Sequence, residues 1–163
     1  MIKLPASFLI KEVKMDKLIL NQLVDEKLKY FKSINEDKVA YNYAYPITSV
    51  FAPNSLGASN VEKITVSGSQ LFIFNQINFV STGAFKVLLK DVATGRELSE
   101  SAISSTVLSD KYFYNEQRGI WLFDIPKIIS GNGELNIILY NDYSGSETNT
   151  IKMFVKGVSI NNR

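Results

Sequence analysis

The side chains that most often carry out catalysis or hold metal ions are missing from this sequence. None of its 163 residues is a histidine or a cysteine. Without histidine there is no imidazole to act as a general base, and serine–histidine–aspartate and cysteine–histidine arrangements are excluded. Without cysteine there are no disulfides or thiol nucleophiles, and a zinc site would have to rely on carboxylates alone. These absences favour a protein that is not an enzyme and uses no cofactor or metal.

The sixteen acidic residues leave two chemical possibilities. Glu97 and Glu100 fall in an expected loop and Asp124 follows Phe123, and a pair of carboxylates at the right separation can hydrolyse glycosides. Any sequence with this many acids contains such pairs, so ordinary surface charges are the simpler interpretation. Residues 141–147 carry oxygen-bearing side chains that could bind Ca²⁺, but their spacing does not match an EF-hand loop. We expect a polar hairpin loop there.

An amphipathic helix is predicted near the N-terminus, from about Asp16 to Phe31. Its apolar face consists of residues at helical spacing, namely Leu20, Leu23, Val24, Leu28 and Phe31, with charged and amide side chains opposite. This helix precedes every expected strand, so we predict that residues 1–38 form a helical arm whose apolar face packs on a neighbouring subunit, in trans. The alternative is that the helix folds back in cis and covers part of its own domain.

After Asp37 the sequence period changes from that of a helix to that of a strand. Val39, Tyr41, Tyr43 and Tyr45 alternate with small or polar residues, and Pro46 marks the end or the edge of this strand. The continuous apolar run 71–74 is typical of a strand covered on both faces. Residues 39–163 hold about nine or ten short strands with turn signals every 8–12 residues. The sequence therefore predicts an antiparallel β-sandwich domain, and a jelly roll fits the strand count.

Several aromatic residues could form a binding surface. Amphipathic aromatic side chains stack on sugar rings or anchor protein interfaces. The candidates are the stripe Tyr41, Tyr43 and Tyr45, and a second set made of Tyr112, Tyr114 and Trp121. The simpler interpretation is packing between strands, because tyrosine is a good strand former. We expect Trp121, which lies between Ile120 and Leu122, to be a core residue.

The charge and hydropathy patterns narrow the range of partners. The net charge is +2, with the excess of lysine in residues 1–33. Nucleic-acid-binding proteins usually carry a stronger basic stripe, so nucleic acid is not the favoured partner. Pro5 interrupts the first apolar run, which argues against a signal peptide, and no stretch approaches the ~18 apolar residues of a membrane span. We expect a protein that is made in the cytoplasm and does not insert into membranes.

In its general texture, with a helix ahead of strands rich in Asn, Ser and Tyr, the chain resembles small virion proteins of bacteriophages. That resemblance implies a non-catalytic structural protein of the virion, which decorates the capsid, forms a minor capsid component or builds head–tail parts. Its partners would be other protein subunits, in a homo-oligomer or larger assembly. Residues 121–126, followed by 133–137, are similar in rhythm to late strands of sugar-binding sandwiches. This second resemblance implies a carbohydrate-binding module as the alternative, with a glycan ligand.

Overall fold

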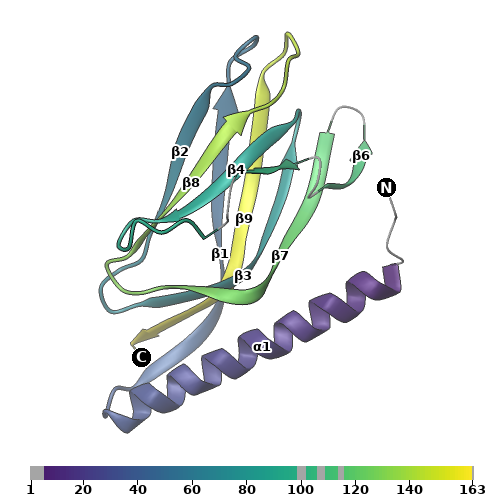
Figure 1. Cartoon of the computed structure of the whole chain (residues 1–163). Coiled ribbons are helices and arrows are strands. Elements are labelled where there is room, and N and C mark those ends of the chain that lie inside the picture. Colours follow the sequence, from purple (N-terminus) through teal and green to yellow (C-terminus); the bar gives the residue numbers. More distant parts are fainter. Residues whose placement is uncertain (1–5, 99–101, 106–108, 114–115, 163) are drawn as a thin grey trace.

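The computed structural model describes residues 6–98, 102–105, 109–113 and 116–162, and it describes side chains for these except at 6–16, 109–113 and 116–117. One long helix is followed by nine described strands (Figure 1). The elements are α1 (Ala6–Ser33), β1 (Lys38–Phe51), β2 (Ser59–Thr65), β3 (Leu71–Ser81), β4 (Phe85–Asp91), β5 (Ile103–Ser104), β6 (Ser109–Phe113), β7 (Glu116–Ile129), β8 (Glu134–Asn141) and β9 (Asn149–Asn162).

The strands form two antiparallel sheets that pack face to face, which confirms the predicted β-sandwich with an N-terminal helix. The larger sheet has the order β1-β9-β3-β7-β6, and the smaller has the order β2-β8-β4-β5. The pairing is nested: β1 pairs with β9, β2 with β8, β3 with β7, and β4 with β5. Strands near the two ends of the chain therefore lie side by side, and successive strands alternate between the sheets except at β4–β5 and β6–β7.

The core fills the space between the two sheets. Every second residue of the paired strands points inward, because side chains alternate across a strand. The inward residues include Phe72 and Phe74 of β3, which are fully buried, and Phe123 of β7, whose ring lies 5.6 Å from that of Phe74 at 90°. This perpendicular arrangement is one that aromatic pairs prefer. Burial of large side chains from both sheets holds the sandwich together at roughly 1.5–3 kcal/mol for each.

Helix α1 lies across the outer face of the larger sheet, the face turned away from the core (Figure 1). Leu20 and Val24 are buried there, together with Ile73, Val158 and Ile160 of the sheet, and Leu23, Leu28 and Phe31 are partly buried beside them. The helix therefore packs in cis, and the expectation of packing in trans is wrong for this chain. The reason is that Ile73, Val158 and Ile160 point away from the core and need an apolar cover of their own.

The helix begins at Ala6, ten residues earlier than predicted from the spacing of its apolar face. Its end is fixed by a left-handed residue, Asn35 (φ 61°), and by a hydrogen bond from Glu36 N to Phe31 O (2.9 Å), the pattern of a Schellman C-cap. Lys38 then ties the helix to the sheet. Its Nζ donates to Asn162 Oδ1 (2.9 Å), pairs with a Glu36 carboxylate oxygen (3.2 Å) and lies 4.8 Å from the Phe31 ring centroid.

Candidate functional site

One long edge of the larger sheet is open. Among the described strands, β1 pairs only with β9, without interruption, and β1 carries no charged residue after Lys38. Thr150, which lies opposite Val50 in the ladder, uses its backbone N–H and C=O for hydrogen bonds to Thr82 on its other side. Val50 and Thr150 are therefore not hydrogen-bonded to each other, and the backbone groups of Val50 point away from β9. By the alternation of an antiparallel ladder, the even-numbered residues from 40 to 48 also point their N–H and C=O groups outward. Pro46 is one of them, and its missing N–H therefore costs no ladder bond.

Very little covers this open edge. Among the described residues, the one side chain that bonds it is Asn60 of β2, which donates to Val50 O (3.2 Å) and to Ser49 Oγ (2.9 Å) at the far end of the strand. The stretch from Ala40 to Thr48, called the open edge below, has no hydrogen-bond partner beyond β9 in the part of the chain that the structure describes. Unpaired strand edges of this kind are templates for pairing with another chain.

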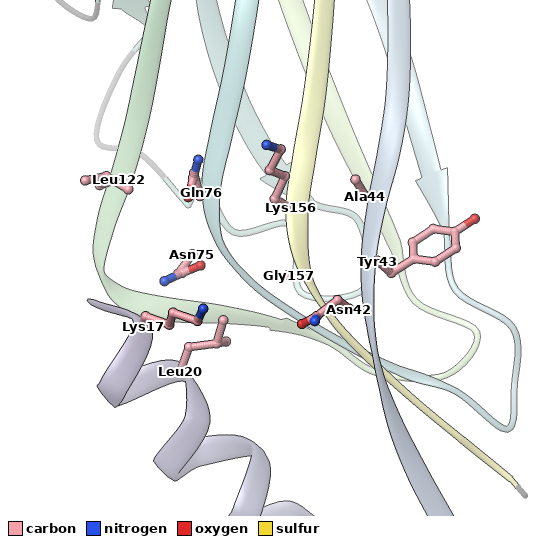
Figure 2. Close-up of a pocket in the computed structure, with 10 residues that line it drawn as sticks. All are labelled: Lys17, Leu20, Asn42, Tyr43, Ala44, Asn75, Gln76, Leu122, Lys156 and Gly157. Carbon is pink, nitrogen blue, oxygen red and sulfur yellow. The ribbon is translucent and has the colours of Figure 1, made fainter. Parts of the chain in front are cut away.

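The tyrosine stripe of β1 accompanies the open edge. Tyr41 and Tyr43 are 53% and 49% exposed, whereas Tyr45 is partly buried and its ring lies 4.8 Å from both Tyr43 and Phe72. Burial, and to a smaller extent the neighbouring Tyr43, raises the pKa of Tyr45 above the ordinary tyrosine value. The Tyr43 ring points outward past β1, away from β9 (Figure 2). One end of the stripe is thus packed in the core, and the other presents two rings beside unpaired backbone.

The second aromatic set does not form a described surface. Trp121 is 9% exposed and belongs to the core, where its ring lies 4.5 Å from Phe123. This position matches the core interpretation, and Trp121 has no open face on which a sugar could stack. Tyr112 lies in β6, but its side chain is outside the described residues, as is the whole of Tyr114.

A groove of about 470 Å³ runs between the helix and the outer face of the larger sheet (Figure 2). Lys17 and Leu20 approach it from the helix, and the other lining residues come from β1, β9, β3 and β7. Its polar side chains are Lys17, Lys156, Asn42, Asn75 and Gln76, and its apolar lining includes Leu20, Leu122 and Ala44. We call this the helix–sheet groove.

A β-bulge shapes the floor of the groove. Against β9 the register of β3 shifts between Phe74 and Gln76, so Asn75 is the extra residue of this pair and lies in the groove lining. Gly157 of β9 faces this bulge, and a Cβ there would lie 2.0 Å from Ile73 O, so only glycine permits the close approach. Beyond the bulge, Gln76 and Asn78 lie on the outer face, and the Gln76 amide donates to Asn78 Oδ1.

The groove continues onto the part of the outer face that the helix leaves uncovered. The strand registers place residues of β1, β9, β3 and β7 in rows across the sheet. The row at the groove is Ala44, Lys156, Gln76 and Leu122; the next is Pro46, Phe154, Asn78 and Ile120; the third is Thr48, Lys152, Val80 and Arg118. The charged residues of these rows are all basic, and Phe154 is 44% exposed among them. We call these rows the basic face.

The carboxylates considered from the sequence are not brought together. Asp124 lies on β7 of the larger sheet, Glu97 forms an isolated bridge with Lys90 of the smaller sheet, and Glu100 is outside the described residues. Within the described residues, no cluster of three or more His, Cys, Asp or Glu side chains could hold a metal ion.

The polar segment 141–147 contributes to a buried hydrogen-bond network. Asn149, which is fully buried, accepts from Gly83 N (2.9 Å) and donates to Ala84 O (3.0 Å) and to Asn141 Oδ1 (2.9 Å). Asn141 is therefore engaged in holding two loops together, and Asp142 lies 3.7 Å from the Lys86 ammonium. These contacts support the interpretation of a structural polar loop at this end of the sandwich.

The groove and the basic face were missed by the sequence analysis. One signal was present: Lys152 and Lys156 alternate with buried residues of β9, which predicts that both lysines share one face. What the sequence did not show is that Gln76 and Asn78 lie beside them, because strand order and the bulge at Asn75 determine that.

Within the described part of the chain, no helix is both long and apolar enough to cross a membrane.

These features define a β-sandwich protein with a helix packed on one sheet and an open sheet edge. No protein-family model matches the chain, and no curated protein matches it in sequence. Solved structures with a similar fold include viral capsid proteins. The subviral particle of infectious bursal disease virus VP2 has 10% identity and a TM-score of 0.35, with 77% of this chain and 37% of that chain covered.

Two further neighbours are a viral protein and a cellulose-binding domain. The virus-like particle of the extra small virus of the giant freshwater prawn Macrobrachium rosenbergii has 12% identity and a TM-score of 0.34, over 74% of this chain and 78% of that chain. The N-terminal cellulose-binding domain of a Cellulomonas fimi glucanase has 7% identity and a TM-score of 0.37, over 75% and 87%. Likenesses at this level identify neither a ligand nor a partner for this chain.

Proposed function

We propose that this chain is a non-catalytic assembly protein with a jelly-roll domain, and that it joins other protein subunits through the open edge of β1. The missing histidine and cysteine support the absence of catalysis. The assembly implied by the resemblance to bacteriophage virion proteins is a virus particle, in which the chain would be a capsid decoration, minor capsid or head–tail component.

The strand order supports the jelly roll. With β6 set aside, β1-β9-β3-β7 face β2-β8-β4-β5. The hydrogen-bonded pairs nest from the outermost strands of the chain to the innermost, as they would if one long hairpin were rolled into two sheets. A jelly roll has eight strands in two such sheets.

The observation that carries the proposal is the open edge itself. Natural proteins protect long edges with charges, bulges or covering elements, because exposed edges pair with other chains. The open edge is uncharged, and Pro46 is its one interruption. A strand added to it would satisfy the outward backbone groups and bury part of Tyr41 and Tyr43. If two copies paired through β1 about a two-fold axis, the larger sheets would become continuous across both subunits.

The test is the solution mass of the full chain and of two variants, Asn42→Pro and Asn42→Ala, by light scattering over a range of concentrations. Both variants remove the same amide side chain. Because residue 42 points its N–H outward, proline there removes a donor from the open edge without breaking a bond to β9. We expect the wild-type chain and Asn42→Ala to form the same oligomer. The dissociation constant of the Asn42→Pro oligomer should be at least about tenfold higher, which corresponds to the loss of about one hydrogen bond and the contacts around it.

Circular dichroism of both variants checks that the sandwich is intact. A monomeric wild-type chain at all concentrations would argue against self-assembly through β1. Equal masses for the wild-type chain and a folded Asn42→Pro variant would place the interface elsewhere on the molecule.

A further inference from the structure

The helix–sheet groove and the basic face together have the chemistry of a binding site that the assembly role does not use. We propose that they bind an acidic polysaccharide, whose sugar rings carry carboxylate or sulfate groups and whose chain runs from the groove across the basic face. This inference does not depend on pairing through the open edge.

Charge is the first argument. Lys17 from the helix and Lys156 from β9 line the groove, and no carboxylate is among the lining residues. Asp124, two residues beyond Leu122, lies outside the lining. Lys152 lies on the same face of β9 as Lys156, four residues and roughly 13 Å away along the strand. Lysine ammonium groups in a groove lining without a carboxylate favour an anionic ligand, and their spacing favours one with repeated charges.

The amide groups indicate a sugar rather than a simple anion. Asn42, Asn75 and Gln76 line the groove, and each carboxamide can both donate and accept hydrogen bonds. Sugar hydroxyl groups also both donate and accept hydrogen bonds. Carboxamides therefore match the hydroxyl groups of a sugar ring better than they match a phosphate or sulfate ion. Asn78 continues the same chemistry in the next row of the basic face.

Apolar surface beside the polar groups completes the site. Leu20 and Leu122 line the groove, and Phe154 is 44% exposed in the second row, next to Asn78. An exposed ring on a flat sheet can cover the C–H face of a sugar, while the amide and ammonium groups contact its edges. The site therefore presents an apolar platform bordered by amides and cations over several rows.

A single-stranded nucleic acid is the competing ligand, and the observations favour it less. Nucleic-acid-binding sheets stack successive bases on several aromatic side chains. Phe154 is the one described aromatic residue on the rows of the basic face, and the ring of Tyr43, which also lines the groove, points outward past β1 (Figure 2).

The test is affinity electrophoresis of the full chain in native gels that contain polygalacturonate, dextran sulfate or neutral dextran. A single-stranded DNA oligonucleotide and poly-glutamate compete in parallel. We expect retardation by polygalacturonate, dextran sulfate or both, none by dextran, and weaker retardation as salt is raised. The first two gels distinguish a carboxylate-bearing from a sulfate-bearing sugar.

Two matched variants locate the site. Lys156→Gln should weaken the binding about tenfold, because it removes a charged hydrogen-bond donor at the groove. Lys63→Gln makes the same change in charge on β2 of the smaller sheet, away from the groove, and should leave binding within about twofold. Binding to neither acidic polysaccharide overturns the proposal. Equal weakening by the two variants also overturns it, as does tighter binding of the DNA or of poly-glutamate.

Discussion

The position of the helix can be tested by two identical substitutions at neighbouring sites. Leu20 is 8% exposed and packs with Val24, Ile73 and the β9 residues beneath the helix, whereas Leu18 is 57% exposed. Replacing a buried leucine by alanine costs about 2–5 kcal/mol. Leu20 borders the helix–sheet groove, where water can enter the space left by the side chain, so we expect about 2–3 kcal/mol. Leu18→Ala should change stability by less than about 0.5 kcal/mol.

Urea unfolding followed by far-ultraviolet circular dichroism measures both variants. With a slope of about 1–3 kcal/mol per molar urea, Leu20→Ala should lower the midpoint by about 1 M. Leu18→Ala provides the control because it makes the same change in helix propensity. Equal midpoints for the two variants would refute the cis packing. If the loss in Leu20→Ala appeared only at concentrations where the chain associates, the helix would instead be packing on a second subunit.

Three further predictions concern stability. Asn149→Ala should cost about 3 kcal/mol, because it leaves the buried Gly83 N–H without this partner and removes four hydrogen bonds of the Asn149 side chain. Asn136→Ala, whose buried Oδ1 has no hydrogen-bond partner among the described residues, should cost less than about 1 kcal/mol in the same urea titration. The raised pKa of Tyr45 means that the folded chain holds the phenol proton more tightly than the unfolded chain does. The free energy of unfolding should therefore fall as pH rises above about 10. In thermal unfolding, the Tyr45→Phe variant should lose less stability over the same pH range than the wild-type chain. Lys38→Met should destabilise the end of the helix by about 1–3 kcal/mol, because it removes the hydrogen bond to Asn162 and the ion pair with Glu36. Amide hydrogen exchange in residues 28–33 should then become faster. Unchanged exchange there would contradict the role given to Lys38.

The sandwich could be predicted from the sequence because several of its strands alternate between buried and more exposed residues, β8 along its whole length. Leu135, Ile137 and Leu139 of β8 are fully buried, and the residues between them are partly exposed. Such a pattern depends only on the local period of the strand. The strand order could not be predicted, because pairings such as β1 with β9 join residues that are far apart in the sequence, for example Lys38 with Asn162, and nothing local specifies them.

The sequence contains a signal for the packing of the helix. The apolar run 71–74 predicts a strand covered on both faces, and Ile73 is buried on the face opposite Phe72 and Phe74. A β-sandwich covers only one face of each sheet, so a second cover had to come from elsewhere in the chain or from another subunit. The apolar face of residues 20–31 was the one long unassigned apolar surface, and it supplies that cover in cis.

The two proposed surfaces share β1, and this links their functions. Along the open edge, Asn42 and Ala44 direct their backbone groups toward a pairing strand, while both residues also line the helix–sheet groove. An antiparallel pair of β1 strands related by a two-fold axis perpendicular to the sheet would place both basic faces on the same side of one continuous sheet. A polysaccharide long enough to span both would bind the second face at a high effective concentration. Because coupling between two binding events is reciprocal, the polysaccharide would also stabilise the pairing of β1 strands. Adding it should therefore raise the mean solution mass of Asn42→Ala and leave that of Asn42→Pro unchanged. A ligand that bound both variants equally without changing the mass of either would show that the groove and the edge act independently.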